Sequence, residues 1–254
     1  MSLKFWSIAI PVAVVIAGAV VIYLDYSDRS DPQPQHDIGH YHEQDTYDHD
    51  SSYDTSAAET ALQEPDSADM ARILEIEEEI EQSGNTSLQI AYYGEMIQIY
   101  MDNDRLDAAG DAGYRLAELT DEKDDWINAA DWFYTWLDEE PNETRRFYFA
   151  ARAASAYANA LEKNPQDYEL RTDKAAALIA AGQPEEAKEH LELALEENSD
   201  YLDANYNLGV ILYRMGSIDE SISYLRKSNE LAQGTERQAM VEEFLDQNDI
   251  SLLQ

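Results

Sequence analysis

The chain has 254 residues and a formal net charge of -36 at pH 7, because 53 Asp and Glu residues face only 17 Lys and Arg residues. This charge repels the phosphates of nucleic acids, so we exclude nucleic acid as a partner. The chain contains no cysteine, which excludes disulfide bonds, a thiol nucleophile and a lipid anchor attached through cysteine.

The first predicted element is a transmembrane helix over residues 5–24, a run that carries no charged side chain. At about 1.5 Å per residue, a helix of this length crosses roughly 30 Å of hydrocarbon. Lys4 precedes the run, whereas Asp25 and Asp28 follow it. The positive-inside rule therefore places residues 1–4 in the cytoplasm and the rest of the chain on the exported, periplasmic or extracellular side of the cell's inner (cytoplasmic) membrane.

A cleaved signal peptide is the alternative reading of the same segment. The tripeptide Ala17-Gly18-Ala19 has the small residues of a cleavage site. The apolar run continues well past this tripeptide, so we favour an uncleaved single-pass anchor that contacts the lipid bilayer, and cleavage stays open.

Residues 25–67 are predicted to form a disordered, acidic linker. Ile38 is the only aliphatic residue before Ala57, and Pro32, Pro34 and Pro65 interrupt any helix. So little apolar surface cannot offset the entropy lost when a chain becomes ordered. The linker would therefore tether the rest of the chain to the membrane without packing against it.

The linker also holds four of the five histidines, which are candidate metal ligands: His36, His40, His42 and His49. Imidazole groups with nearby carboxylates suit Zn²⁺, Cu²⁺ or Ni²⁺. The segment has no cysteine and no helical spacing that would hold the ligands in place. We favour a polar linker with incidental histidines and expect no metal and no cofactor, with metal handling as an alternative function.

The remaining segment, residues 68–250, is predicted to be helical throughout. Helices are expected over residues 68–81, in a pair from Ser87 to Leu119 that turns at Asn103-Asp104, and at the C-terminal end over residues 236–245 as a cap. An irregular unit is expected to pair a helix over residues 124–137 with a longer one over residues 144–163, on either side of Pro141.

Two repeats, residues 168–201 and 202–235, have matched residues 34 positions apart: Gly182 and Gly216, Ala187 and Ser221, Leu191 and Leu225, Ala194 and Ser228. This period, filled by two amphipathic helices and a turn, is typical of a helical solenoid. Ser217 and Glu220 also have the spacing of a capping box. Small side chains would allow the paired helices to approach closely, at Ala175, Ala187, Ala194, Gly209 and Ser221.

The same residues resemble the tetratricopeptide-repeat (TPR) family. One repeat carries Leu208-Gly209, Leu212, Ser221, Leu225 and Ser228 at the family's positions, and the preceding repeat carries Ala175, Leu178, Ala187, Leu191 and Ala194. The resemblance implies an all-α, TPR-like solenoid of helical hairpins, which the transmembrane helix and the disordered linker precede.

In the TPR family, the first helix of each pair lines a concave groove that binds a peptide. Carried onto this chain, the resemblance predicts an acidic rim and groove positions at Glu169 and Asp203. It also predicts groove residues at Ile127, Asp131, Tyr134, Thr172, Ala176, Ile179, Tyr206, Val210, Tyr213 and Arg214. The Lys, Asn and Arg set with which some TPR domains clamp a C-terminal carboxylate is missing, apart from Asn207.

The sequence contains no catalytic motif, so we expect no enzymatic activity. It has no glycine-rich phosphate loop, no His-Glu-x-x-His and no Gly-x-Ser-x-Gly. The leading hypothesis is a membrane-anchored scaffold or adaptor that binds a protein or peptide segment on the exported side, in assembly or chaperoning of an exported complex. An apoprotein-binding subunit of the cytochrome c maturation type is an alternative, and homo-oligomerisation stays open.

Overall fold

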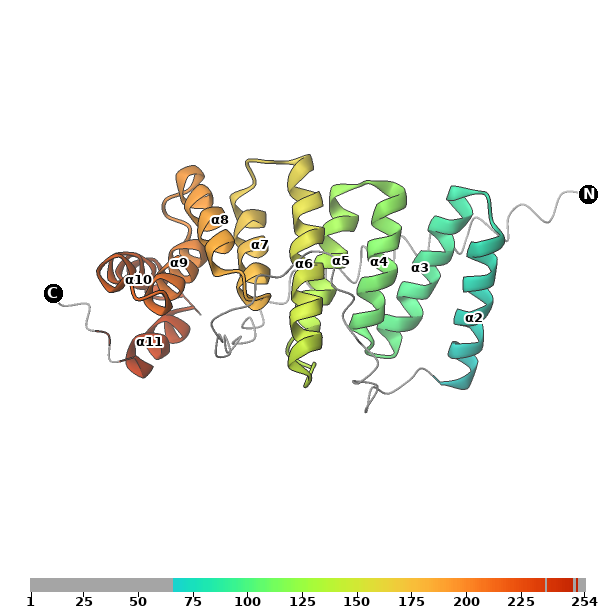
Figure 1. The fold of residues 1–254 in the computed structure, drawn as a ribbon, viewed down its shortest axis with the longest axis horizontal. Coiled ribbons are helices and arrows are strands. Elements are labelled where there is room, and N and C mark those ends of the chain that lie inside the picture. Colours follow the sequence, from blue (N-terminus) through green and yellow to red (C-terminus); the bar gives the residue numbers. More distant parts are fainter. Residues whose placement is uncertain (1–65, 236, 249, 251–254) are drawn as a thin grey trace, which may run out of the picture. The chain divides into compact units, whose positions relative to one another are not determined.

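The computed structural model describes residues 66–250 apart from residues 236 and 249, and the regular elements within this part are all α-helices. The described residues fall into two compact units, residues 66–139 and residues 140–250. The helices of the first unit are α2 (Ser67–Gln82), α3 (Thr86–Asp102), α4 (Leu106–Thr120) and α5 (Lys123–Trp136). Those of the second are α6 (Glu143–Lys163), α7 (Tyr168–Ala180), α8 (Pro184–Glu197), α9 (Leu202–Arg214), α10 (Ile218–Ala232) and α11 (Gln238–Gln247), all labelled in Figure 1.

In the first unit, consecutive helices pack against one another, and α4 and α5 share the most extensive contact. A Cβ atom built on Gly110 would lie 2.6 Å from Cδ1 of Phe133, and one on Gly113 would lie 2.5 Å from Cζ3 of Trp132. Glycine is therefore required on α4 to make room for the two aromatic rings of α5. The pair expected from Ser87 to Leu119 is present as α3 and α4.

The irregular unit expected from residues 124–163 needs a correction. Both of its helices exist within one residue of the expected bounds, as α5 and α6, but they belong to different compact units. The physical reason is that the two glycines of α4 make room for the aromatic rings of α5, so α5 packs against α4. Helix α6 instead packs against α7, the helix that follows it.

In the second unit, α7 with α8 and α9 with α10 form the two hairpins that the 34-residue period predicts. Each hairpin turns at a glycine in the left-handed region, Gly182 with φ 73° and Gly216 with φ 82°. The side chain of Ser217 makes no capping hydrogen bond, so the expected capping box at this turn does not form. The turn is held instead by backbone bonds, including one from the Ser217 amide to the Leu212 carbonyl at 2.9 Å.

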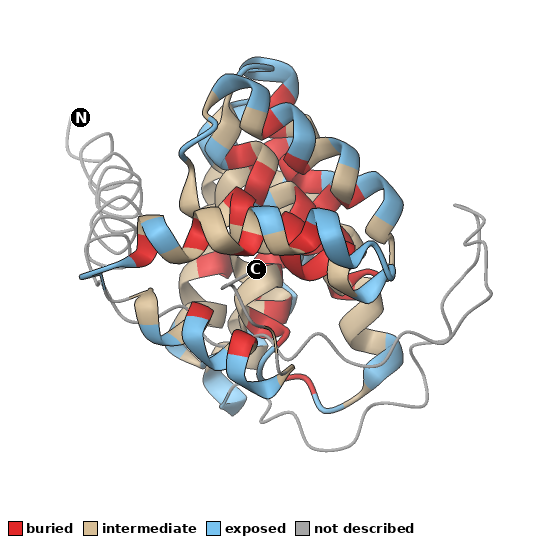
Figure 2. Ribbon diagram, turned by 90° about the vertical axis from the view of Figure 1, so that its left-hand side faces the viewer, coloured by how far each residue is buried: buried red, intermediate tan, exposed pale blue. Residues whose placement is uncertain are grey.

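The five small residues predicted to lie between paired helices are buried. Ala175, Ala187, Ala194 and Ser221 are each 0 % exposed. In the last hairpin the Ser221 hydroxyl donates a 2.8 Å hydrogen bond to the Gly209 carbonyl, so a polar side chain fits the contact without an unsatisfied donor. Figure 2 shows buried residues in red along the helices and exposed residues in pale blue.

The predicted transmembrane segment and the predicted linker lie outside the described residues. Within residues 66–250, none of the helices combines the length and the apolarity that a bilayer crossing requires. The membrane prediction therefore rests on the sequence of residues 4–31 alone.

Candidate protein-binding surface

The ten predicted groove residues divide between the two units, and each group is described within its own unit. Ile127, Asp131 and Tyr134 lie on α5 in the first unit, where all three are half-buried. The other seven lie on α7 and α9 or, in the case of Arg214, at the C-terminal end of α9.

Three of the seven do not line an open surface. Thr172 and Ile179 on α7 are 2 % and 5 % exposed, and Val210 on α9 is 1 % exposed. Helix α7 packs against α6, α8 and α9, so the face of α7 that carries Thr172 has no access to solvent. The Thr172 hydroxyl donates to the Tyr168 carbonyl at 2.9 Å. The expectation that these three residues contact a bound peptide is therefore corrected for this conformation, while Ala176 is half-buried and Arg214 is exposed.

On α9, Tyr206, Val210 and Tyr213 lie against the C-terminal helix α11. The ring of Phe244 meets the rings of Tyr206 and Tyr213 edge to face, with centroid distances of 6.0 Å and 5.9 Å and interplanar angles of 81° and 84°. The Tyr213 hydroxyl also lies 3.5 Å from the backbone carbonyl of Asn248. Aromatic pairs in this geometry contribute roughly 0.5–1.5 kcal/mol beyond the area that they bury.

Beneath these rings, apolar residues from three helices form one cluster. Val210 from α9, Leu225 and Ala232 from α10, and Val241 and Leu245 from α11 are all buried. Val241 is 0 % exposed and Leu245 is 7 % exposed, so one face of α11 is fully used in this contact.

An ion pair closes the N-terminal end of the same contact. Arg237, the residue before α11, lies 3.3 Å from the carboxylate of Asp203 on the first turn of α9. Burial raises the pKa of Asp203, and the guanidinium of Arg237 opposes this rise. Burial also raises the pKa of Tyr206 to about 12.

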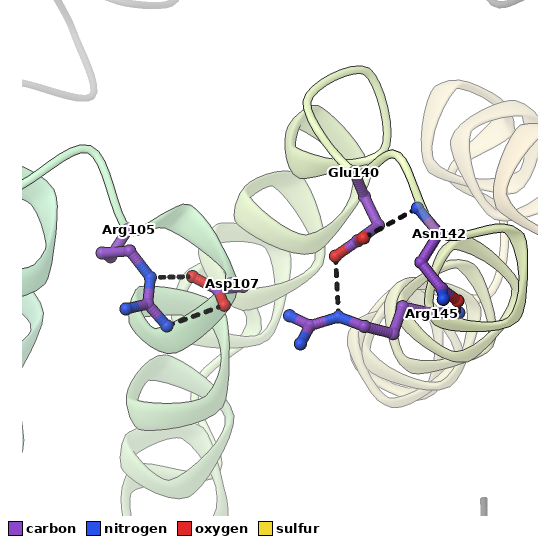
Figure 3. Close-up of polar contacts among 5 residues, drawn as sticks. All are labelled: Arg105, Asp107, Glu140, Asn142 and Arg145. Atoms are coloured by element: carbon purple, nitrogen blue, oxygen red, sulfur yellow. Dashed lines mark hydrogen bonds and ion pairs between the residues drawn. The ribbon is translucent and has the colours of Figure 1, made fainter. Parts of the chain in front are cut away.

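The most buried ion pairs of the described residues stabilise local structure (Figure 3). In the first unit, Arg105 binds Asp107 through two hydrogen bonds of 2.8 Å and 3.0 Å. In the second unit, Glu140 accepts a 2.7 Å bond from Nε of Arg145 and a 3.0 Å bond from the amide of Asn142, the N-cap of α6. These charges are compensated by their neighbours, as buried charges must be.

His190 is the only histidine within the described residues, and it joins α8 to α7. Its Nε2 lies 2.8 Å from the ammonium group of Lys174, which also lies 3.1 Å from Glu186. Burial lowers the pKa of His190, and the positive charge of Lys174 lowers it further. A neutral imidazole that accepts a hydrogen bond from Lys174 fits this geometry, so we assign His190 a packing role.

The four linker histidines, His36, His40, His42 and His49, lie outside the described residues, so the structure does not test the metal alternative. Within residues 66–250, no three His, Asp or Glu side chains are grouped so that they could hold a metal ion.

The sequence signalled a terminal helix, but it did not indicate which residues that helix would cover. Its sequence does carry a usable pattern: Arg237 is followed by Val241 at +4, Phe244 at +7 and Leu245 at +8. This spacing places all four residues on one helical face. A helix with one such apolar face is expected to pack against another element of the chain, and in the structure α11 packs against α9 and α10.

Comparison with known proteins agrees with the repeat pattern. The family model of the tetratricopeptide repeat matches residues 150–198 and again residues 178–243. A search of curated proteins finds no significant match.

Several solved structures are similar in part. MamA is 16 % identical with a TM-score of 0.46, over 66 % of this chain and 89 % of its own. TTC0263, a TPR protein of Thermus thermophilus, is 15 % identical with a TM-score of 0.48, over 72 % and 91 %. YrrB, described as a TPR protein with an unusual peptide-binding site, is 17 % identical with a TM-score of 0.48, over 69 % and 87 %.

Proposed function

We propose that this chain is a scaffold that binds a segment of a partner protein, because residues 150–243 match the family model of the tetratricopeptide repeat. Members of this family generally mediate protein–protein interactions. For this chain, the surface that we propose is the first-helix face of the last hairpin, on α9.

One observation carries this proposal: the α9 face already holds a helix of this chain. Tyr206 and Tyr213 contact Phe244 of α11. Val210 lies in one apolar cluster with Val241 and Leu245 of α11, and Asp203 pairs with Arg237, the residue before α11. Aromatic side chains next to an apolar floor are typical of residues that dominate binding energy in protein interfaces. A face with this composition is suited to bind a polypeptide helix.

The second part of the proposal is that residues 5–24 anchor the scaffold in the cytoplasmic membrane, with the repeats on the exported side. Its support is the uncharged run between Lys4 and the acidic residues that follow it. The acidic linker would then allow the repeats to reach partners near the membrane, in assembly or chaperoning of an exported complex.

The absence of cysteine makes the topology directly measurable. We expect Ser52→Cys in the full chain to react with a membrane-impermeant maleimide added from the exported side, and Ser2→Cys to react only after the membrane is opened. Both variants should stay in the membrane pellet after a carbonate wash. Release into the wash, or labelling of Ser2→Cys in intact membranes, would contradict the anchor and its orientation.

The binding surface is tested by photo-crosslinking in the native cells. A photoreactive amino acid at Arg214, exposed at the end of α9, should yield a discrete adduct with a partner protein. The matched control is the same amino acid at Leu193, which is 42 % exposed on α8. Equal adducts from both positions would indicate contact without a specific surface, and an adduct from Leu193 alone would reject the first-helix face.

A further inference from the structure

The C-terminal helix α11 closes the second unit, but it is not the start of a further repeat. Leu208-Gly209 of α9 would be matched 34 residues later, and those positions hold Glu242 and Glu243. Both glutamates are exposed, whereas Leu208 and Gly209 are buried. Helix α11 therefore lacks the small buried residue through which α9 makes its close contact with α10.

Helix α11 is also too short to be stable as a helix on its own. It has 10 residues, against 13 in α9. Isolated helices shorter than about 12–15 residues are marginal in water, so α11 depends on its contact with α9 and α10 to remain helical. Its connection to α10 runs through Gly234, which has φ 75° and which allows the backbone there to adopt other conformations.

The contact between α9 and α11 consists of three kinds of complementary interaction, which together could select a particular helix. Asp203 pairs with the cation of Arg237, and Val210 packs in one cluster with the aliphatic residues one and two turns after Arg237. Tyr206 and Tyr213 both contact the ring of Phe244. The ion pair is partly exposed, with side-chain exposures of 35 % for Arg237 and 27 % for Asp203. A partly exposed pair contributes little affinity but fixes orientation, so the pattern also specifies the direction of the bound helix.

We propose that α11 is an exchangeable occupant of the α9 surface, which accepts in its place an amphipathic helix of the partner protein. The partner helix would present a basic residue followed by an aliphatic residue at +4, an aromatic residue at +7 and an aliphatic residue at +8. This proposal rests on the proposed function and adds to it the chemistry of the ligand and the regulation of the site.

Exchange has a quantitative consequence. A segment tethered by a short flexible connection competes at an effective concentration on the order of millimolar. The apparent affinity for a partner helix is reduced by the fraction of molecules in which the α9 surface is free. Intact α11 should therefore make binding weak, and any change that loosens α11 without altering α9 should strengthen it.

The test uses the full chain and a fluorescent synthetic peptide with the sequence of residues 237–248. We expect the chain with Phe244→Ala, which loses the ring between Tyr206 and Tyr213, to bind this peptide at least tenfold more tightly than the unaltered chain does. The control is Asp246→Ala, an exposed position on the same helix, which should leave the affinity unchanged. A second peptide with Phe244→Ala should bind at least tenfold more weakly than the first.

A tether provides the reverse measurement. In a chain with Asp203→Cys and Arg237→Cys, a short bifunctional maleimide can join α11 to α9, because the chain has no other cysteine. Peptide binding should be lost after joining, when compared with the same variant before joining. Retained binding in the joined chain would place the peptide elsewhere and overturn the exchange.

Two further outcomes would also overturn the proposal. One is equal peptide affinity in the Phe244→Ala and unaltered chains while circular dichroism shows that α9 and α10 keep their helicity. The other is a dimer that disappears with Phe244→Ala, which would mean that α11 is exchanged between two copies. In either case the partner adduct at Arg214 could still form, so the failure of exchange is separable from the failure of the proposed function.

Discussion

Ala187→Arg is expected to lower the free energy of unfolding of the second unit by more than about 3 kcal/mol. Ala187 is 0 % exposed in the contact between α7 and α8, at the position that Ser221 has in the next hairpin. A long charged side chain cannot reach solvent from this position without separating the two helices. Unfolding followed by circular dichroism in urea measures the effect.

The matched control is Leu193→Arg on the same helix. Leu193 is 42 % exposed, so the introduced guanidinium stays in water and the free energy of unfolding should change by no more than about 0.5 kcal/mol. If Ala187→Arg unfolded at the same urea concentration as Leu193→Arg, the close contact between α7 and α8 would be misplaced.

Phe133→Ala is expected to destabilise the first unit by about 3–5 kcal/mol. Phe133 is 0 % exposed and is the largest fully buried side chain of the described residues. Its ring packs directly against Gly110 on α4, which has no side chain that could move into the void. The cavity therefore remains after the substitution.

Tryptophan fluorescence reports this change selectively. Trp126, Trp132 and Trp136 all lie on α5, and the fourth tryptophan, Trp6, lies in the predicted anchor. The fluorescence transition in urea should move to lower urea in Phe133→Ala, and it should move little in Leu88→Ala, which alters a side chain that is 41 % exposed in the same unit. A transition that is unchanged by Phe133→Ala would mean that the ring is not part of the packed core.

The two C-terminal hairpins could be predicted from the sequence because their geometry restricts the residue type at single positions. A turn with positive φ favours glycine, and the two glycines, Gly182 and Gly216, are 34 residues apart. Close helix contacts require small residues, and these recur at Ala187 and Ser221. Each constraint acts on single positions, so the period can be read without knowledge of the rest of the fold.

Pairing between helices was less predictable. The sequence of α5 and α6 gives two well-bounded helices, but it does not say which neighbour each one packs against. That choice depends on Gly110 and Gly113 on α4, two positions whose importance appears only when Phe133 and Trp132 are seen against them. A glycine within a helix can indicate a close contact, a kink or no contact, so the spacing alone did not decide.

The predicted groove residues differ in their burial, which the sequence does not show. The repeat register identifies the first-helix positions, but it does not show which of them neighbouring helices bury. Thr172, Ile179 and Val210 are buried, whereas Tyr206 and Tyr213 keep partly exposed rings under Phe244. A terminal helix has no following repeat, so no periodic residue in the sequence reveals that α11 lies over these two tyrosines.

We propose that the first-helix face of the last hairpin binds a helix of a partner protein. Hydrogen exchange tests it most directly, on the full chain alone and in complex with the protein recovered through the adduct at Arg214. We predict that the partner slows exchange of the α9 amides and speeds exchange of the α11 amides, because α11 leaves the surface. Slower exchange in the outward faces of α8 and α10, with α9 and α11 unchanged, would contradict the claim.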